Sequence, residues 1–409
     1  MNPKVLIATT ARWFPTARLA LALANAGFVV DAVCPSHHPL AKVDRVGRLY
    51  DYRNLNPLGS FFDAISASKP ELVLPGDDLA AQHLHAMFEE GLRTGRTEVS
   101  QLIERSLGSS QNFAILYART EFMNLAQQEG VRVPDTQVIR SANDLRNWVA
   151  QKGLPTVLKT DGSSGGDGVR IMRTLADAER AFRTLQAPPL LARAAKRTLF
   201  DRDARLLRPS LLRVRSAVNA QVFVDGREAN SAVACWNGEV LASLHFEVIH
   251  KVAASGHATV VRLIDHAEMS EAVKRIVRRL KLSGVHGFDF MLEASGAGAY
   301  LIEINPRTTQ VGHLTLGLGS DLPAALYAAA SGKEPSAAQK VTDLDTIALF
   351  PQEWLRDPSS KFLQSAYHDV PWDQPELIRA CVSARRKRRA WDSQQSQLHR
   401  FSLAQLPRL

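Results

Sequence analysis

Short apolar runs alternate with helical patterns along the first hundred residues. Residues 4–8, 28–33 and 71–76 are apolar runs of strand length, and residues 16–26 have helical character that ends at Gly27. Strands that alternate with helices in this way favour a parallel sheet with helices on its faces. The N-terminal part of the chain is therefore predicted to be an α/β domain.

Two aspartates follow the apolar run 71–76. Asp77 and Asp78 come directly after this predicted strand and before a helix that begins near Leu79. Loops at the carboxyl ends of parallel strands are where open α/β sheets bind ligands. Aspartate is also a favoured cap at the start of a helix. The two side chains are therefore expected either to face a substrate or to cap the helix.

The middle of the chain is richer in strand patterns than its beginning. Helices are predicted over residues 117–129, 142–151 and 269–282. Strands are predicted over residues 154–160, 220–224, 231–235, 240–246, 259–263, 287–292 and 299–304. The small residues at 295–298 predict that the last two strands form a hairpin. From about residue 335 the sequence has no clear periodicity, and residues 384–409 are expected to be loosely ordered or peripheral.

Composition excludes several classes of protein. The chain has 409 residues, of which 45% are hydrophobic and 22% charged, and this globular composition excludes fibrous and wholly disordered proteins. A run of about 18 uncharged apolar residues, as a transmembrane helix needs, does not occur in the sequence. Cys34, Cys235 and Cys381 are far apart and odd in number, which argues against a disulfide framework or a zinc site. We therefore expect a protein of the reducing cytoplasm.

The basic charge of the chain is concentrated in two segments. The formal net charge is +9, and basic residues cluster within 193–215 and again within 385–389. Such runs are usually solvated faces or tails, although they also suit anionic partners. No platform of aromatic residues is interleaved with either run, so sequence-specific nucleic-acid recognition is not expected.

A loop rich in glycine and serine follows the predicted strand that contains Lys159. Residues 162–168 include six glycines or serines that permit close approach of the backbone to a ligand. Successive backbone N–H groups in such a loop can bind phosphate, and the lysine adds a positive charge for the same group. The loop matches neither the P-loop nor the dinucleotide-binding pattern. It therefore predicts a phosphate site of another kind, or a plain turn.

A second group of polar residues lies on the predicted hairpin. Residues two apart on a strand share a face, so Glu303 and Asn305 point the same way, and Asp289 can join them from the neighbouring strand. Two carboxylates and an amide oxygen are hard ligands that suit Mg²⁺. Burying these groups unpaired would be costly, which argues against a plain core role. The hairpin is therefore predicted to hold a metal.

These two patterns, in this order and about 120 residues apart, resemble the ATP-grasp superfamily of carboxylate–amine and carboxylate–thiol ligases. The resemblance is nearest to members that look like one half of the carbamoyl-phosphate-synthase large subunit, and it covers roughly residues 117–332. It implies an α/β fold, α+β in its central part, with an N-terminal parallel-sheet domain ahead of a two-subdomain ATP-grasp fold. The domains implied are residues 1–112, an ATP-grasp domain at 113–333 with subdomains 113–215 and 216–333, and a C-terminal extension at 334–409.

The resemblance also implies roles for individual residues. The phosphate-gripping lysine and glycine-rich lid of the family match Lys159, Gly162, Ser163, Ser164, Gly165, Gly166 and Gly168. The hinge whose backbone meets adenine matches Gln221, Val222, Phe223 and Val224. The acidic residue that holds the ribose hydroxyls matches Glu228. The metal ligands match Asp289, Glu303 and Asn305.

Two arginines complete the implied site. Arg307 matches the arginine that orients the transferred phosphoryl group or the acyl phosphate, and Arg119 stands where a further phosphate-binding lysine is usual. Arginine keeps the charge but differs from lysine in shape and hydration. Lys251, His257 and His313 are further candidates for contacts with the nucleotide or the acceptor substrate.

The activity implied by the resemblance is that of an ATP- and Mg²⁺-dependent (or Mn²⁺-dependent) ligase. A substrate carboxylate attacks the γ-phosphate to give ADP and an acyl phosphate, and an amine or a thiol then displaces phosphate. Two metals bridged by Glu303 neutralise the developing charge. The partners expected are small-molecule carboxylates and amines, and the resemblance allows a homodimer. Two alternatives stay open: an ATP-binding module without ligase turnover, and a polyanion-binding protein.

Overall fold

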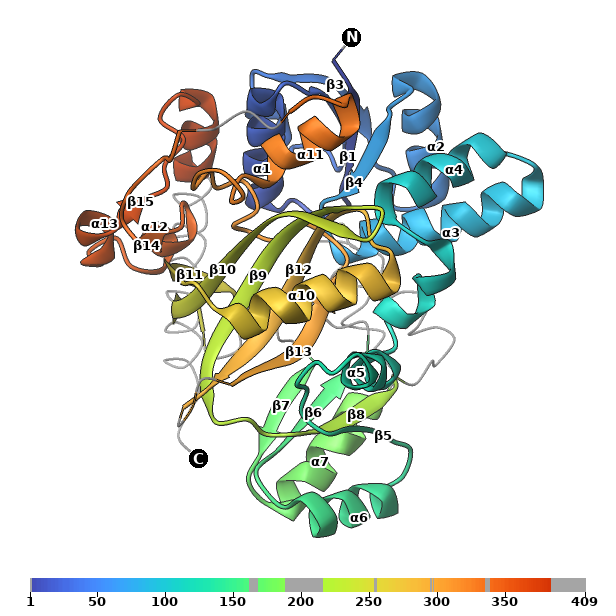
Figure 1. Cartoon of the computed structure of the whole chain (residues 1–409), viewed down its shortest axis with the longest axis vertical. Coiled ribbons are helices and arrows are strands. Elements are labelled where there is room, and N and C mark those ends of the chain that lie inside the picture. Colours follow the sequence, from blue (N-terminus) through green and yellow to red (C-terminus); the bar gives the residue numbers. More distant parts are fainter. Residues whose placement is uncertain are drawn as a thin grey trace, which may run out of the picture.

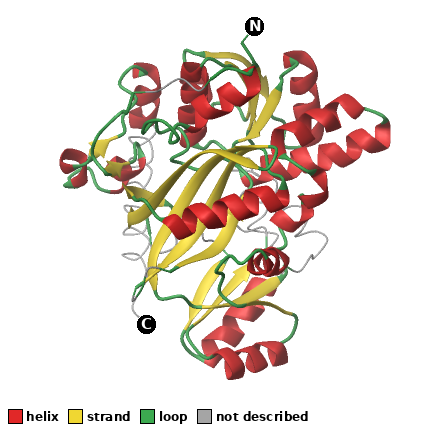
Figure 2. Ribbon diagram, in the orientation of Figure 1, coloured by secondary structure: helices red, strands yellow, loops and turns green. Residues whose placement is uncertain are grey.

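The computed structural model shows an α/β protein whose strands form three sheets (Figures 1 and 2). The predicted fold class, with a parallel sheet at the N-terminal end, is confirmed. No helix among the described residues is long and apolar enough to cross a membrane. The structure describes residues 2–161, 168–187, 216–253, 256–294, 296, 298–334 and 339–383.

The N-terminal domain is built on a four-stranded parallel sheet of order β3-β2-β1-β4. Because β2 and β4 flank β1 on opposite sides, the strand order reverses at β1, and the loops after β1 and β4 leave the sheet side by side. Such a reversal is a common ligand site in open α/β sheets. The strands are β1 (Lys4–Ala8), β2 (Val29–Cys34), β3 (Val46–Asp51) and β4 (Leu72–Pro75). The helices are α1 (Phe14–Ala26), η1 (Pro39–Lys42), α2 (Pro57–Ser68), α3 (Asp78–Thr94) and α4 (Thr97–Leu107).

Local sequence explains how these elements begin and end. The strands β1 and β4 are almost wholly buried apolar runs, as both faces of the sheet are covered. Helix α1 ends at Gly27, whose φ of 113° is a left-handed conformation that glycine adopts without steric cost. Asp77 caps α3 by accepting a hydrogen bond from the backbone N–H of Ala80. Of the two alternatives for the aspartates, capping thus falls to Asp77.

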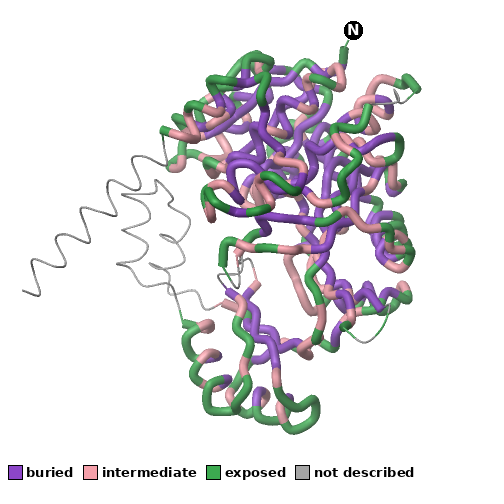
Figure 3. Tube along the Cα trace, turned by 90° about the vertical axis from the view of Figure 1, so that its left-hand side faces the viewer, coloured by how far each residue is buried: buried purple, intermediate pink, exposed green. Residues whose placement is uncertain are grey.

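A small lobe follows, with a four-stranded antiparallel sheet of order β5-β8-β6-β7. Its own core packs α6 and α7 against the sheet, and its outer helical faces are exposed (Figure 3). Two short turns and one helix lead into it: η2 (Ser110–Asn112), η3 (Ala114–Leu116) and α5 (Arg119–Gln128). The lobe contains β5 (Thr136–Ile139), α6 (Ala142–Lys152), β6 (Thr156–Thr160), β7 (Val169–Met172), α7 (Leu175–Gln186) and β8 (Val218–Val222).

The third sheet has seven strands in the order β13-β12-β9-β10-β11-β14-β15 and occupies the middle of the molecule (Figure 1). Helix α10 covers one face, and α11 packs on β9 and β10 and against α1 of the N-terminal domain. Its strands are β9 (Gly226–Trp236), β10 (Glu239–Lys251), β11 (Ala258–Leu263), β12 (Gly284–Glu293), β13 (Ala299–Asn305), β14 (Thr346–Ala348) and β15 (Tyr367–His368). The helices are α10 (Ala267–Leu280), α11 (Leu322–Ser331), α12 (Gln352–Arg356) and α13 (Phe362–Ser365). The predicted hairpin of β12 and β13 is observed.

The segment beyond residue 334 is joined to the rest of the protein more closely than its sequence indicates. Strand β14 pairs with β11, and β15 pairs with β14, so the segment extends the large sheet. A buried network adds to this attachment: Asp369 pairs with Arg18 of α1 and accepts a hydrogen bond of 2.7 Å from Nε2 of His313. The N-terminal domain, the large sheet and this segment consequently share one hydrophobic core.

A buried ion pair in this segment gives a prediction about stability. Arg356 donates to both oxygens of the fully buried Glu353, at 2.7 and 2.5 Å. Burial alone would raise the pKa of Glu353, but hydrogen bonds from Arg356 and Ser360 outweigh it and lower the pKa to about 2. We expect Glu353→Gln to lower the free energy of unfolding at pH 7 by roughly 3 kcal/mol, measured by urea unfolding.

The pH dependence supplies the check on this prediction. A carboxylate whose pKa is depressed on folding stabilises the fold above its unfolded pKa of about 4.5, and this stabilisation is lost as pH falls toward about 2. The difference between wild type and Glu353→Gln should therefore shrink below pH 4.5. Glu376→Gln is the matched control, because Glu376 forms the same i,i+3 pair with Arg379 on an exposed surface. The control should change stability by less than about 1 kcal/mol, and an equal loss in both variants would contradict the prediction.

Candidate active site

A β-bulge on the hairpin decides which side chains face the space between the small lobe and the large sheet. Asp289 of β12 lies directly opposite Glu303 of β13, and the next pair joins Phe290 to Leu301, so Ile302 is the extra residue. Leu301 and Ile304 both lie in the core under α10 because the bulge shifts the alternation of faces between them. Glu303 and Asn305 are thereby turned to the opposite face, where Asp289 also lies.

The three predicted metal ligands are brought together on this face. The Asn305 Nδ2 donates to Oδ2 of Asp289 at 3.0 Å. Burial first and the neighbouring carboxylate of Glu303 second raise the pKa of Asp289 to about 6. Burial also acts to raise the pKa of Glu303, but the positive charges of Arg119 and Lys159 outweigh it and lower this pKa. Like charges directly opposite on neighbouring strands are destabilising unless a cation lies near them.

The donor set fits a hard divalent cation. Asp289, Glu303 and Asn305 offer two carboxylates and one amide oxygen, the oxygen ligands that Mg²⁺ prefers. Among the described residues there is no cluster of three or more His, Cys, Asp or Glu side chains that could hold a metal. A cation at the hairpin would thus depend on Asn305 as the third ligand.

Two buried cations face these carboxylates. Lys159, on β6 of the small lobe, is 5% exposed, and its pKa is lowered to about 8 by burial first and by Arg119 next. The carboxylates of Glu303, Asp289 and Glu228 act in the opposite direction on the same pKa. Arg119, the first residue of α5, donates from Nη2 to Glu303 at 3.0 Å. Lysine and arginine from the small-lobe side thus meet the acidic face of the large sheet.

Arg307 connects the hairpin to the N-terminal domain. Its Nη2 donates to Oδ1 of Asn305 at 3.1 Å and its Nε donates to Oδ1 of Asp78 at 2.9 Å. Its guanidinium carbon lies 5.4 Å from the centre of the Trp13 ring, in the loop after β1. Asp78 therefore faces the site, which is the first of the two alternatives given for the aspartates. The neighbouring Asp77 caps the helix, which is the second.

Asp77 also fixes the loop that carries Trp13. Its carboxylate accepts hydrogen bonds from Thr9, Thr10 and Ala11, with donor–acceptor distances between 2.6 and 3.1 Å. One side chain thereby ties the loop after β1 to the start of α3. The two loops at the reversal point of the N-terminal sheet are thereby joined to each other.

The residues predicted to bind the adenine and ribose lie on and around the segment that connects the small lobe to the large sheet. Strand β8 ends at Val222 and β9 begins at Gly226, so residues 223–225 join the small lobe to the large sheet. Gln221 is buried and its amide donates to Thr136, so its side chain serves the contact between β8 and β5. Glu228 pairs with Lys251 at 2.6 Å, which places two predicted nucleotide contacts side by side.

The other predicted residues are placed as follows. Gly168 is the one member of the glycine-rich loop with a described position, and Gly162, Ser163, Ser164, Gly165 and Gly166 lie outside the described residues. The basic residues of 193–215 and 385–389 also lie outside them. His313 is buried and paired with Asp369, which gives it a place in the core.

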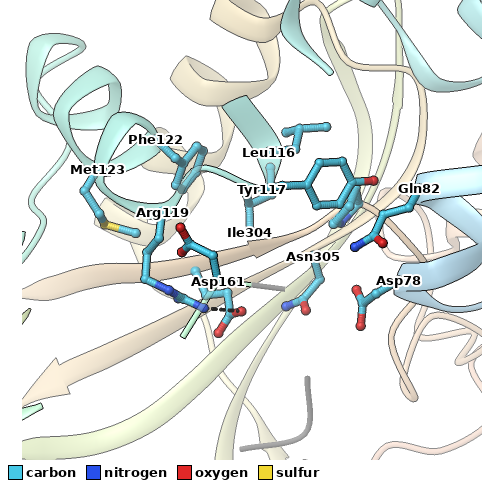
Figure 4. Close-up of a pocket in the computed structure, with 12 residues that line it drawn as sticks. Asp78, Gln82, Leu116, Tyr117, Arg119, Phe122, Met123, Asp161, Ile304 and Asn305 are labelled. Atoms are coloured by element: carbon cyan, nitrogen blue, oxygen red, sulfur yellow. Dashed lines mark hydrogen bonds and ion pairs between the residues drawn. The ribbon is translucent and has the colours of Figure 1, made fainter. Parts of the chain in front are cut away.

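A cavity extends from the hairpin to α3 and has a lining that sequence reasoning only partly foresaw (Figure 4). Gln82, Tyr117 and Asp161 were missed as lining residues. A signal for Gln82 was present, because residues four apart on a helix share a face and Gln82 follows Asp78 at that spacing. The lining residues are Asp78, Gln82, Leu116, Tyr117, Arg119, Phe122, Met123, Asp161, Glu303, Ile304, Asn305 and Pro306.

Two sheets that face each other across a buried lysine, with an acidic hairpin on the larger sheet, define an ATP-grasp protein. The chain belongs to the family described as carbamoyl-phosphate synthase L chain, ATP binding domain, whose model matches residues 118–322. The family assignment made from the sequence is thereby confirmed. Compared by sequence with curated proteins, the chain has no match.

Solved structures of ligases share this fold. N5-carboxyaminoimidazole synthetase from Staphylococcus aureus, in complex with ADP, matches with a TM-score of 0.58 and 16% identity over 81% of this chain and 78% of its own. The biotin carboxylase domain dimer of 2-oxoglutarate carboxylase from Hydrogenobacter thermophilus, with MgADP, ADP and bicarbonate, matches with a TM-score of 0.57 and 15% identity over 83% and 72%. N5-carboxyaminoimidazole ribonucleotide synthetase from Thermus thermophilus matches with a TM-score of 0.55 and 17% identity, over 81% of this chain and 79% of its own.

Proposed function

We propose that this protein is a Mg²⁺-dependent ligase that uses ATP to activate a substrate carboxylate for attack by an amine. The carboxylate attacks the γ-phosphate of ATP, which gives ADP and an acyl phosphate. The amine, in its neutral form, then attacks the acyl carbon, phosphate leaves, and the proton lost from the nitrogen passes to the released phosphate or to water. Family membership supports ATP-dependent activation of a carboxylate in general, and the residues of the site support this more detailed form.

The observation that carries the proposal is the opposition of charges across the two sheets. Lys159 and Arg119 supply positive charge for phosphate oxygens, and Arg307 supplies it at the far end of the hairpin. Phosphoryl transfer needs positioning and charge neutralisation more than acid–base groups, and these side chains supply both. Mg²⁺ held by Asp289, Glu303 and Asn305 would neutralise further charge on the phosphates.

An ADP-release screen tests the proposal. Purified protein with Mg·ATP is offered amino acids and small carboxylates in pairs with amines, and bicarbonate is included because the biotin carboxylase domain was solved with that anion. ADP release that requires both an acid and an amine is the expected result. Mg²⁺-dependent ATP binding without ADP release over the whole panel would favour a binding module. Polyanion binding that falls steeply with salt would favour a polyanion-binding protein.

Lys159→Ala should weaken the binding of Mg·ATP by about tenfold to a hundredfold. The ammonium group of Lys159 is buried, so it would make a charge-assisted contact with phosphate that is worth on the order of 1.5–3 kcal/mol. Isothermal calorimetry measures the affinity. Lys152→Ala is the control, since Lys152 lies in the same lobe but forms an exposed pair with Asp135. Wild-type affinity in Lys159→Ala would count against the assignment.

A further inference from the structure

The end of the cavity beside α3 is lined by side chains that have hydrogen-bond acceptor atoms not used within the described part of the chain. Asp78, Gln82 and His85 are spaced i, i+4 and i+7 along α3, so they lie along one face of this helix. Asp78 and Gln82 line the cavity directly, and the Tyr117 hydroxyl enters it held by Nδ1 of His85 at 3.0 Å. Figure 4 shows the three polar ends on the same side of the cavity, beyond Asn305.

Asp78 uses only half of its carboxylate for the ion pair with Arg307. Its Oδ1 accepts from Nε of Arg307, whereas Oδ2 accepts no hydrogen bond from any residue that the structure describes. Each nitrogen of the guanidinium already donates: Nε to Asp78, Nη1 to the carbonyl of Thr308 and Nη2 to Asn305. Arg307 is therefore engaged, and Asp78 still has one charged oxygen to offer to the cavity.

Gln82 and Tyr117 add two neutral acceptors. The side chain of Gln82 is half-buried and makes no hydrogen bond within the described part of the chain, so its amide oxygen can turn to a ligand. Burial raises the pKa of Tyr117, and Asp78 raises it further, so the phenol stays neutral. In either tautomer of His85 the Tyr117 oxygen keeps at least one lone pair for the cavity.

These features favour a cationic ligand with several N–H donors. Three of the charged side chains that line the cavity are carboxylates (Asp78, Asp161 and Glu303), and one is the guanidinium of Arg119, which is paired with Glu303. A primary ammonium group carries three donors and no acceptor. We propose that this end of the cavity is the amine subsite, in which Asp78, Gln82 and Tyr117 bind the ammonium group of a primary amine substrate.

The apolar lining indicates what such an amine carries. Leu116, Ile304 and Pro306 line the same cavity, and they offer contact to aliphatic carbon. The substrate class is thus a primary aliphatic amine rather than a thiol, which has a single weak donor. The inference rests on the proposed ligase function and names the nucleophile of that same site, an amine that binds as its ammonium ion and loses one proton to water before it attacks.

Direct binding tests the subsite without any turnover. The probe is n-propylammonium, which stays protonated at pH 7, and n-propanol is the neutral analogue of the same shape. Ligand-observed NMR titrations of the full chain measure both affinities. We expect n-propylammonium to bind at least tenfold more tightly than n-propanol. Asp78→Asn should abolish this preference, because Asp78 is the charged member of the three proposed ammonium ligands and its loss leaves Arg307 without its ion-pair partner.

A control and a second variant keep the test decisive. Glu89→Gln removes the same charge from an exposed position of α3 and should leave the preference unchanged. Gln82→Met leaves the ion pair of Arg307 in place and should weaken the binding of n-propylammonium at least threefold. The proposal can therefore be tested even if Asp78→Asn does not fold. Equal affinity for the two probes, or an unchanged preference in both cavity variants, would overturn it. Because no ATP is consumed, a failed ADP-release screen would refute the ligase function separately from the subsite.

Discussion

Glu303→Gln is expected to reduce turnover on the order of 10³-fold while weakening the binding of Mg·ATP only modestly. The substitution keeps the size of the side chain but removes one negative charge from the proposed ligand set. Asp289 and Asn305 could still hold a cation that accompanies ATP into the site. Phosphoryl transfer, however, needs charge to be neutralised on the γ-phosphate as it moves, so the rate depends on the full set more than binding does.

The measurement is the ADP-release rate together with calorimetric affinity for Mg·ATP. Glu268→Gln is a suitable control, because Glu268 is also paired with an arginine, Arg132, and its side chain is 34% exposed against 28% for Glu303. It should change neither quantity by more than about twofold. Full turnover in Glu303→Gln, or an equal loss of binding and rate through misfolding, would leave the metal-centred mechanism unsupported.

Much of the fold could be predicted from the sequence because its elements have strong periodic patterns. The buried runs of β1 and β4, the helix α1 that ends at Gly27 and the hairpin of β12 and β13 were all expected near their observed positions. The strands β14 and β15 were not predicted. They have only three and two residues, and such short strands carry no recognisable alternation. Their pairing depends on β11, a partner that the local sequence does not indicate.

The site could be predicted only in part, for reasons of geometry. The spacing of Glu303 and Asn305 predicted one shared face, but strict alternation from Leu301 would have turned that face into the core. The bulge at Ile302 resolves this conflict, and nothing in the residues themselves marks it. The contact of Asp78 with Arg307 joins residues 229 positions apart, and it follows from the docking of the N-terminal domain against the hairpin.

Arg307→Ala is expected to lower turnover by about 10²- to 10³-fold and to leave Mg·ATP affinity nearly unchanged. The guanidinium lies beyond the proposed metal ligands, between Asn305 and Asp78, so its proposed partner is the transferred group rather than bound nucleotide. Arg307→Lys should recover only part of the rate, because lysine restores the charge without the planar fork. The measurements are kcat for ADP release and calorimetric affinity for Mg·ATP.

Two further variants separate this role from the loss of an ion pair. Arg279→Ala breaks a pair with Glu129 that has the same 2.9 Å contact through Nε but lies on the exposed side of α10, and it should leave turnover unchanged. Arg307→Ala combined with Asp78→Asn removes both charges, so the uncompensated carboxylate is gone. Because Asp78→Asn alone is expected to weaken amine binding, the double variant is compared with that single variant at saturating amine. If the two had equal turnover, the effect of Arg307→Ala would come from the unpaired Asp78. A further loss of about 10²-fold or more in the double variant, with intact Mg·ATP binding, is the result expected if Arg307 acts on the phosphoryl group itself.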